Sequence, residues 1–221
     1  MQEPNLVAKC IESMSKATKL PVTIKTRIGY NEVENFKFLR SFIQTTKNAG
    51  SKKFIIHARK ALLKKLSPKE NLNIPPLKYE FVYKLKEYFK NDEIIINGGI
   101  KTTRDVKDHL SKVDGVMIGR AVYHSPYFLA EIEKNIFNNN NIPTRQEVIE
   151  SLIPYIKNET EKGTQLNQIM RHTLGLFHGQ TGSSFWKRYL SENLCVRDAD
   201  IKKIDHIMDK VKLAPQAHSA G

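Results

Sequence analysis

Short apolar runs alternate with amphipathic segments along the first part of the chain. Four runs have the length of buried strands, at 22–28, 54–57, 93–97 and 115–118. Around them, apolar residues recur every three or four positions, which predicts helices at 6–14, 36–50, 77–89 and 102–110. Another helix is predicted to begin at Ser125, with Pro126 in its first turn. Nearly continuous apolar strands that alternate with helices are typical of an α/β fold with a parallel sheet covered on both faces.

The pattern changes after residue 137. Four consecutive asparagines at 138–141 predict a linker over residues 138–143. Thr144 and Glu147 then have the spacing of a capping box, and apolar residues at helical spacing continue as far as Leu194. We therefore expect two domains, at 1–137 and 144–213, of which the second is small and helical. Residues 214–221 are expected to form a disordered tail.

The charge of the chain is strongly positive and unevenly placed. The sequence has 36 Lys and Arg against 23 Asp and Glu, which gives a formal charge of +13, and +11 of it lies in residues 1–143. Residues 52–69 alone hold seven basic side chains and no acidic one. This composition favours a polyanionic partner, with nucleic acid as the leading candidate.

Cysteines and hydropathy limit the class of protein further. Cys10 and Cys195 lie far apart, which fits neither a disulfide framework nor a zinc site and indicates a reducing compartment. No run approaches the ~18 apolar residues of a membrane span, and the first residues lack a signal-peptide core. We therefore expect a soluble protein with no metal site.

Polar residues and glycines follow the predicted strands. They are Lys25, His57, the Asn97-Gly98-Gly99 segment and the Gly119-Arg120 pair. The carboxyl ends of parallel strands meet at one edge of a sheet, where α/β enzymes bind their ligands. Glycine lets backbone N–H groups approach an anion closely, and arginine offers a fork of donors. Ordinary turns would explain each glycine pair alone, but their coincidence at strand ends favours a phosphate-bearing ligand.

Several segments resemble the tRNA-dihydrouridine synthases. They are Pro-Val-Thr-Ile-Lys-Thr-Arg-Ile-Gly at 21–29, His-Ala-Arg-Lys at 57–60, Ser-Pro-Lys-Glu-Asn at 67–71, Asn-Gly-Gly-Ile-Lys at 97–101 and Gly-Val-Met-Ile-Gly-Arg at 115–120. Arg-His-Thr-Leu-Gly-Leu-Phe at 171–177, with Trp186 beyond it, is similar to the A subfamily. The resemblance implies an FMN-containing TIM barrel with a carboxyl-terminal helical domain. It also implies NADPH-dependent reduction of uridine to dihydrouridine in the D-loop of tRNA, at positions 20 and 20a in this subfamily.

The resemblance also implies roles for individual residues. Lys25 and His57 would contact the flavin ring and its phosphate-bearing tail, and the remaining FMN cradle would consist of Asn97, Gly98, Gly99, Gly119 and Arg120. Lys69 and Lys187 match positions that contact tRNA, although Lys187 replaces an arginine of the subfamily. Ser184 and Leu72 also stand where related chains carry arginine. The expected tRNA surface further includes Arg59, Lys60, Lys64 and Lys65.

Two motifs of the family are absent from the sequence. One is a strand ending in Ala-Pro-Met, and the other is the Asn-x-Gly-Cys-Pro-Ser loop, whose cysteine protonates uracil. The chain thus resembles the carboxyl-terminal half of a (β/α)8 barrel, with four βα units over 1–137, followed by the helical domain. We expect a truncated enzyme that is inactive alone, and we assign no catalytic residue. Cys10 falls at the apolar spacing of its helix and is expected to be a buried structural thiol.

Two other functions are compatible with the sequence. One is a non-catalytic fragment that binds RNA, and the other is an FMN-barrel oxidoreductase that acts on a small molecule. For the complete enzyme we expect a monomer in the cytoplasm, or in an organelle if the missing amino terminus carries a transit peptide. Association through the open half-barrel is an option for this chain.

Overall fold

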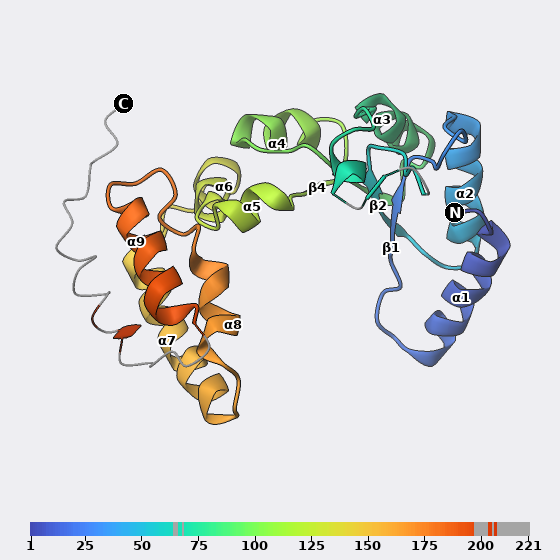
Figure 1. The fold of residues 1–221 in the computed structure, drawn as a ribbon. Helices are drawn as coiled ribbons and strands as arrows, with labels where there is room; N and C mark the ends of the chain where they lie inside the picture. The colour runs from blue at the N-terminus through green and yellow to red at the C-terminus, as the bar shows by residue number, and fades with distance from the viewer. Residues whose placement is uncertain (64–65, 68, 197–202, 205, 207–221) are drawn as a thin grey trace. The chain divides into compact units, whose positions relative to one another are not determined.

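A computed structural model describes residues 1–63, 66–67, 69–196, 203–204 and 206. The chain divides into two compact units, Met1–Gly119 and Arg120–Gly221 (Figure 1). The predicted tail at 214–221 lies outside the described residues. Within the described parts of the chain, no helix combines the length and the apolar character that a membrane span requires.

The first unit is built on a parallel sheet. Its strands are β1 (Ile24–Arg27), β2 (Lys53–His57), β3 (Glu93–Asn97) and β4 (Gly115–Met117). All three neighbouring pairs are parallel, and the spatial order β1-β2-β3-β4 follows the order in the chain. The four predicted strands are thus confirmed, with β1 and β4 shorter than expected. A sheet whose order never reverses has no switch point, so right-handed crossovers carry every connecting helix to the same face.

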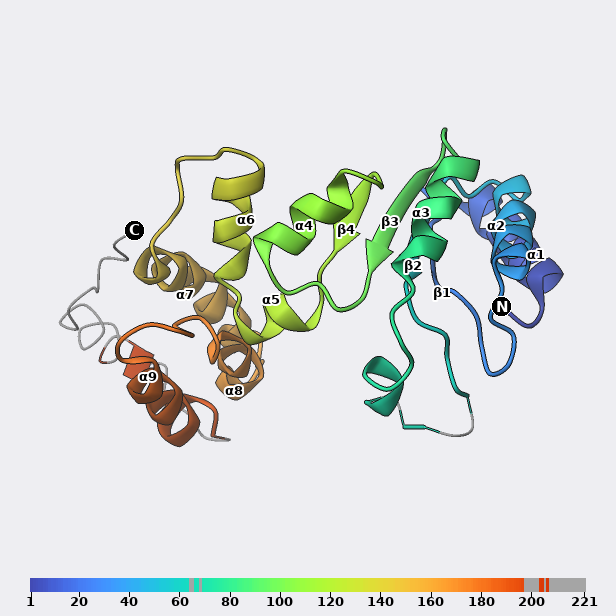
Figure 2. The ribbon, with the colours of Figure 1, turned by 90° about the horizontal axis from the view of Figure 1, so that it is seen from above.

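Helices connect these strands as the periodicity predicts. The first unit contains α1 (Pro4–Ala17), α2 (Phe36–Asn48), α3 (Tyr79–Tyr88) and α4 (Thr103–Leu110), with a short 3-10 turn η1 (Glu70–Leu72) in the loop before α3. The predicted capping box of α4 is present, because Thr102 Oγ1 accepts the N–H of Asp105 and the Asp105 carboxylate accepts the N–H of Thr102. In Figure 2, α3 and α4 lie along the sheet, and α3 contacts β3 while α4 contacts β4.

The two faces of the sheet differ in burial. On the face of the sheet that packs against the helices, every second side chain of the strands is buried. These residues are Ile24, Phe54, Ile56, Ile94 and Ile96. On the opposite face, Ile55 and Ile95 are only half-buried. The prediction of a sheet covered on both faces is therefore wrong for this unit. The physical reason is the sequential strand order, which places the connecting helices on one face.

Two sequence predictions about individual residues also need correction. Cys10 is exposed rather than buried. Of the residues on α1, only Ile11 is buried, because this helix contacts α2 along a narrow stripe. Ser125 and Pro126 do not begin a helix but lie in the turn between α5 (Arg120–His124) and α6 (Phe128–Ile136). The Ser125 N–H still donates to the Ala121 carbonyl, so this turn continues from α5.

The second unit is helical where it is described. After α5 and α6 it contains α7 (Arg145–Glu161), α8 (Leu166–Met170), a 3-10 turn η2 (Arg171–Thr173), α9 (Ser183–Tyr189) and a π-helical turn η3 (Leu190–Leu194). The predicted capping box at Thr144 and Glu147 starts α7. Because this unit includes α5 and α6, it begins before the predicted linker at 138–143. The domain boundaries read from the sequence remain a prediction.

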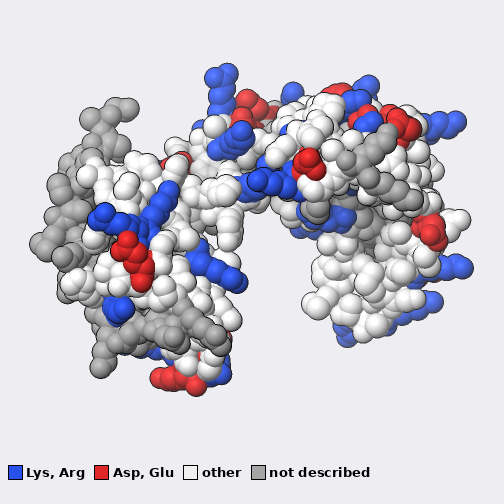
Figure 3. Space-filling model, viewed as in Figure 1, with Lys and Arg blue, Asp and Glu red and all other residues white. Residues whose placement is uncertain are grey.

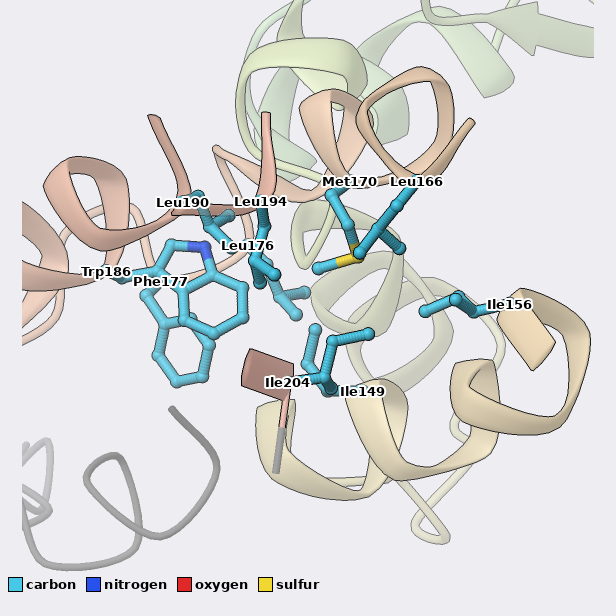
Figure 4. Packing of buried hydrophobic residues seen from close by; sticks show 10 residues of the cluster. All are labelled: Ile149, Ile156, Leu166, Met170, Leu176, Phe177, Trp186, Leu190, Leu194 and Ile204. Carbon is cyan, nitrogen blue, oxygen red and sulfur yellow. The ribbon is translucent and has the colours of Figure 1, made fainter. Parts of the chain in front are cut away.

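The apolar residues predicted for the second unit form its core. Figure 4 shows Ile149 and Ile156 of α7 facing Met170 of α8, with Trp186 against Phe177. The ring centroids of Trp186 and Phe177 are 4.7 Å apart. The indole Nε1 of Trp186 donates to the carbonyl of Thr173 at 3.0 Å. Gly175 is required here, since a Cβ would lie 2.1 Å from the His124 carbonyl oxygen. The Arg-His-Thr-Leu-Gly-Leu-Phe segment with Trp186 is therefore the structural centre of this unit.

Candidate functional site at the carboxyl edge of the sheet

A row of polar side chains crosses the less buried face of the sheet at its carboxyl end. Arg27, His57 and Asn97 are aligned as neighbours on β1, β2 and β3, and the apolar Met117 continues the alignment on β4. Lys25 lies two residues before Arg27, so its side chain leaves β1 on the same face. Three residues predicted for the ligand site, Lys25, His57 and Asn97, are thus on one face of one sheet.

A tight glycine turn follows this row after β3. Gly98 and Gly99 have φ angles of 115° and 74°, which favour glycine. A Cβ on Gly98 would lie 2.7 Å from Cδ2 of His57, and one on Gly99 would lie 2.8 Å from the Tyr79 hydroxyl. No acceptor is assigned to the Gly99 N–H among the residues that the structure describes. Gly99 is only half-buried, so its N–H is a candidate donor to an anion.

Main-chain bonds fix the surroundings of the turn. Ala58 donates its N–H to the Asn97 carbonyl at 2.9 Å, and its own carbonyl accepts the Lys78 N–H at 2.8 Å. The Asn97 amide nitrogen donates to the Met117 carbonyl at 2.8 Å. These bonds orient the Asn97 side chain with its oxygen as the remaining acceptor. These bonds thus connect the carboxyl ends of β2, β3 and β4.

A side chain of the helix that follows the turn accepts the N–H groups of the two residues just before that helix. The Asp105 carboxylate accepts the N–H groups of Lys101 and Thr102, at 2.9 and 3.0 Å. These bonds contribute to lowering the pKa of Asp105, although burial opposes them. The Asp105 N–H itself donates to Thr102 Oγ1 at 3.0 Å, which completes the capping box. These three N–H groups are therefore not available to an anion.

Two neighbouring cations give the row a positive field. The pKa of the Lys25 ammonium is lowered, mainly because partial burial desolvates it and also because the nearby positive charge of Arg27 repels it. In the described part of the chain, Lys25 has no hydrogen bond or ion pair with a carboxylate. The pKa of Arg27 is lowered for corresponding reasons, with burial first and the charge of Arg59 second. An anionic ligand would relieve both repulsions.

The basic loop between β2 and α3 is held by hydrogen bonds from the row. Figure 2 shows this loop extending beyond the carboxyl ends of the strands. The Arg27 guanidinium donates to the carbonyls of Lys60 and Asn71, at 2.8 and 2.9 Å. The Arg59 guanidinium donates to the carbonyls of Asn73 and Pro75. Sequence reasoning missed Arg27, although its position two residues after Lys25 on a strand was a usable signal.

The lysines predicted to bind tRNA have different surroundings. Lys60 is 3.4 Å from the Glu34 carboxylate, which also lies 3.2 Å from Lys78. Lys69 and Lys187 are exposed. Lys64 and Lys65 lie outside the described residues. On the face shown in Figure 3, Lys and Arg are spread over both units with Asp and Glu among them.

The last predicted pair spans the boundary between the units. Gly119 ends the first unit, and a Cβ there would meet nothing within 4 Å. Arg120 is the first residue of α5 in the second unit. Their role in a cradle remains a prediction. Within the described residues, no group of three His, Cys, Asp or Glu could hold a metal ion.

Comparison with known proteins identifies the family. Residues 1–212 match the family model described as dihydrouridine synthase (Dus). The chain is 46% identical over 200 residues to a protein of Synechocystis sp., 45% over 205 residues to one of Shewanella oneidensis, and 46% over 209 residues to one of Haemophilus ducreyi. All three are named tRNA-dihydrouridine(20/20a) synthase. The chain belongs to the dihydrouridine synthase family.

The similarity covers most of this chain but only part of its relatives. The three alignments include 90%, 92% and 94% of the chain and 60%, 61% and 64% of the relatives. The chain therefore spans about three fifths of the length of the curated relatives that it matches. The α/β fold with a parallel four-stranded sheet is consistent with part of a TIM barrel.

The residues of the carboxyl edge fit the flavin expected for a dihydrouridine synthase. In the part of the chain that the structure describes, Lys25 and Arg27 supply positive charge that no carboxylate neutralises. The glycine turn offers the Gly99 N–H, and side chains of His57, Leu77 and Tyr79 pack closely against the two glycines. Both features suit a ligand that combines a phosphate with a planar ring.

Proposed function

We propose that this chain forms the flavin- and tRNA-binding part of a tRNA-dihydrouridine synthase. The reaction is the reduction of uridine to dihydrouridine in the D-loop, at positions 20 and 20a, with FMN and NADPH. The observation that carries the proposal is the cationic row beside a glycine turn, in a chain that matches this family over residues 1–212. The sheet would be part of a TIM barrel, and the second unit would include a tRNA-binding helical domain.

The residues of the edge have distinct tasks in this proposal. When bound, FMN supplies the hydride chemistry for the uracil C5–C6 bond. Lys25 and His57 hold the ring and the tail through donated hydrogen bonds and positive charge. Asn97 offers an acceptor whose orientation is fixed by its bond to the Met117 carbonyl. Gly98, Gly99 and Gly119 supply backbone N–H groups, and Arg120 adds a cation.

The basic loop and the second unit would bind the tRNA backbone. Recognition of folded RNA relies on shape and phosphate contacts, and the target base must leave its stack to be reduced. Lys69 and Lys187 are exposed and suited to phosphates. Arg59 donates to a loop carbonyl, and Lys60 pairs with Glu34. These two residues would therefore contact tRNA from fixed positions. Lys64 and Lys65 complete the proposed surface.

Neither cysteine of the sequence is proposed as the proton donor. Cys10 lies on α1, which leads into the amino end of β1 rather than the carboxyl edge. Cys195 lies beyond η3, and partial burial raises the pKa of its thiol, although Arg171 opposes this change. A positioned acid contributes about 10²–10⁴ to a rate. We therefore expect the 221-residue chain alone to form no detectable dihydrouridine on unmodified tRNA.

An exchange of segments tests the proposal directly. Residues 1–212 would replace the matching segment of the Synechocystis relative, and dihydrouridine would be measured by mass spectrometry of tRNA after incubation with FMN and NADPH. We expect activity from this chimaera, severe loss with Lys25→Ala or His57→Ala, and little change with Cys10→Ala. A folded, flavin-loaded chimaera whose activity is unaffected by Lys25→Ala would contradict the proposed site.

Binding by the chain itself separates this proposal from a non-catalytic RNA-binding fragment. The 221-residue chain should bind FMN more tightly than riboflavin, because the cationic edge recognises the phosphate. An RNA-binding fragment would retain its affinity for tRNA and show no such preference. A small-molecule oxidoreductase would bind FMN but not unmodified tRNA.

A further inference from the structure

The glycine turn needs an external support, because two glycines have little conformational preference of their own. Both residues have positive φ angles, and glycine loses more backbone entropy on ordering than any other residue. If the turn were mobile, ordering it on binding would cost free energy and would weaken the affinity for a phosphate. One side chain from another element fixes the turn.

Tyr79, at the start of α3, is that side chain. Its hydroxyl donates to the Gly98 carbonyl at 2.9 Å. The Gly98 carbonyl and the Gly99 N–H belong to one planar trans peptide and point in opposite directions. Holding the carbonyl on the Tyr79 side therefore aims the Gly99 N–H at the other side. This is the N–H group that lacks an acceptor in the described part of the chain.

The Tyr79 ring is itself held from behind. It packs edge-on against the ring of His109 on α4, with centroids 4.5 Å apart, and His109 is 5% exposed. The hydroxyl oxygen of Tyr83, one turn further along α3, lies 2.8 Å from Nδ1 of His109. Burial and the nearby Asp105 raise the pKa of Tyr79, which keeps its hydroxyl protonated and able to donate.

We propose that Tyr79 is a positioning residue for the ligand phosphate, which aims the Gly99 N–H by holding the Gly98 carbonyl. His109 supports it by fixing the ring. This inference rests on the proposed function, because it takes the phosphate of FMN as the anion at the turn. Tyr79 makes no contact with the phosphate in this scheme and acts only through the peptide between the two glycines.

The test compares Tyr79→Phe with the unchanged 221-residue chain in titrations with FMN and with riboflavin, which lacks the phosphate. Tyr79→Phe keeps the ring against His109 and removes only the hydroxyl. We expect FMN affinity to fall about three- to tenfold, the effect of one lost hydrogen bond, while riboflavin affinity stays unchanged. The matched control is Tyr88→Phe, which removes a hydroxyl that accepts from Arg40 at the other end of α3. It should change neither affinity.

The outcomes separate this inference from the proposed function. If the chain prefers FMN to riboflavin and Lys25→Ala abolishes the preference, but Tyr79→Phe has no effect, the positioning role is wrong and the proposed function stands. Equal losses for FMN and riboflavin in Tyr79→Phe would also overturn it, since a general loosening of α3 would explain them. If the unchanged chain shows no preference for FMN, both proposals fall. Circular dichroism of each variant confirms that it folds.

Discussion

Replacing Gly175 by alanine should destabilise the second unit strongly. The added Cβ would lie 2.1 Å from the carbonyl oxygen of His124 and 2.8 Å from its carbonyl carbon. Since carbon and oxygen in close contact lie about 3.3 Å apart, the two segments must separate by about 1 Å. The opposing atoms are backbone at the end of α5, so no side-chain rotation can relieve the overlap.

The expected magnitude follows from the cost of overpacking. Inserting a methyl group into a tightly packed site costs about 1–3 kcal/mol, and occasionally more. Because main chain must move at position 175, we expect a loss near 3 kcal/mol in the free energy of unfolding. With a urea m-value of about 1–3 kcal/mol/M, the unfolding midpoint should fall by roughly 1–3 M.

The single tryptophan makes the assay specific to this unit. Trp186 is 1% exposed and belongs to the same core as Leu176 and Phe177, so its fluorescence reports the unfolding of that core. The control is Gly179→Ala, where φ is 76° and a Cβ meets nothing within 4 Å. It should lose only about 1–2 kcal/mol, from the left-handed backbone. An equal or smaller loss for Gly175→Ala would refute the steric reasoning.

Three further predictions concern charge. Burial lowers the folded-state pKa of His109, so the unfolded chain takes up the proton first as pH falls. The free energy of unfolding should therefore be highest above about pH 6.5 and should decrease below it. His109→Gln should make this decrease smaller in urea titrations followed by circular dichroism. Glu34→Gln leaves two lysine ammonium groups without their carboxylate and should lower the free energy of unfolding by about 1–3 kcal/mol, whereas an unchanged urea midpoint would show that the cluster is not structural. Lys69→Ala should reduce the slope of log tRNA affinity against log salt by roughly 0.7–0.9. The control is Lys90→Ala, at an exposed position before the amino end of β3, which should leave this slope unchanged. Equal slopes for the two lysine variants would remove Lys69 from the RNA surface.

The local signals in the sequence were sufficient for the elements and for part of the site. Apolar runs located all four strands, and both capping boxes were read correctly because they depend only on residues three positions apart. Lys25, His57 and Asn97 were expected at one edge because carboxyl ends of parallel strands must meet there, and the register places them on one face. The helix α5 carried no such signal, since its five residues have no capping pattern.

The sequence by itself determined the strands, the two helix starts with capping boxes, the positive charge and the motifs of the family. Only the tertiary structure decided which groups are satisfied by one another. Cys10 was expected inside from its spacing, but α1 buries a narrower stripe than its pattern allows. The Asp105 carboxylate accepts the N–H groups of Lys101 and Thr102, just before α4, so these two donors are not available to an anion. Tyr79 reaches Gly98 from another helix, across 19 positions of chain. Periodicity describes only neighbours along the chain, whereas these contacts depend on how separate elements pack against the sheet.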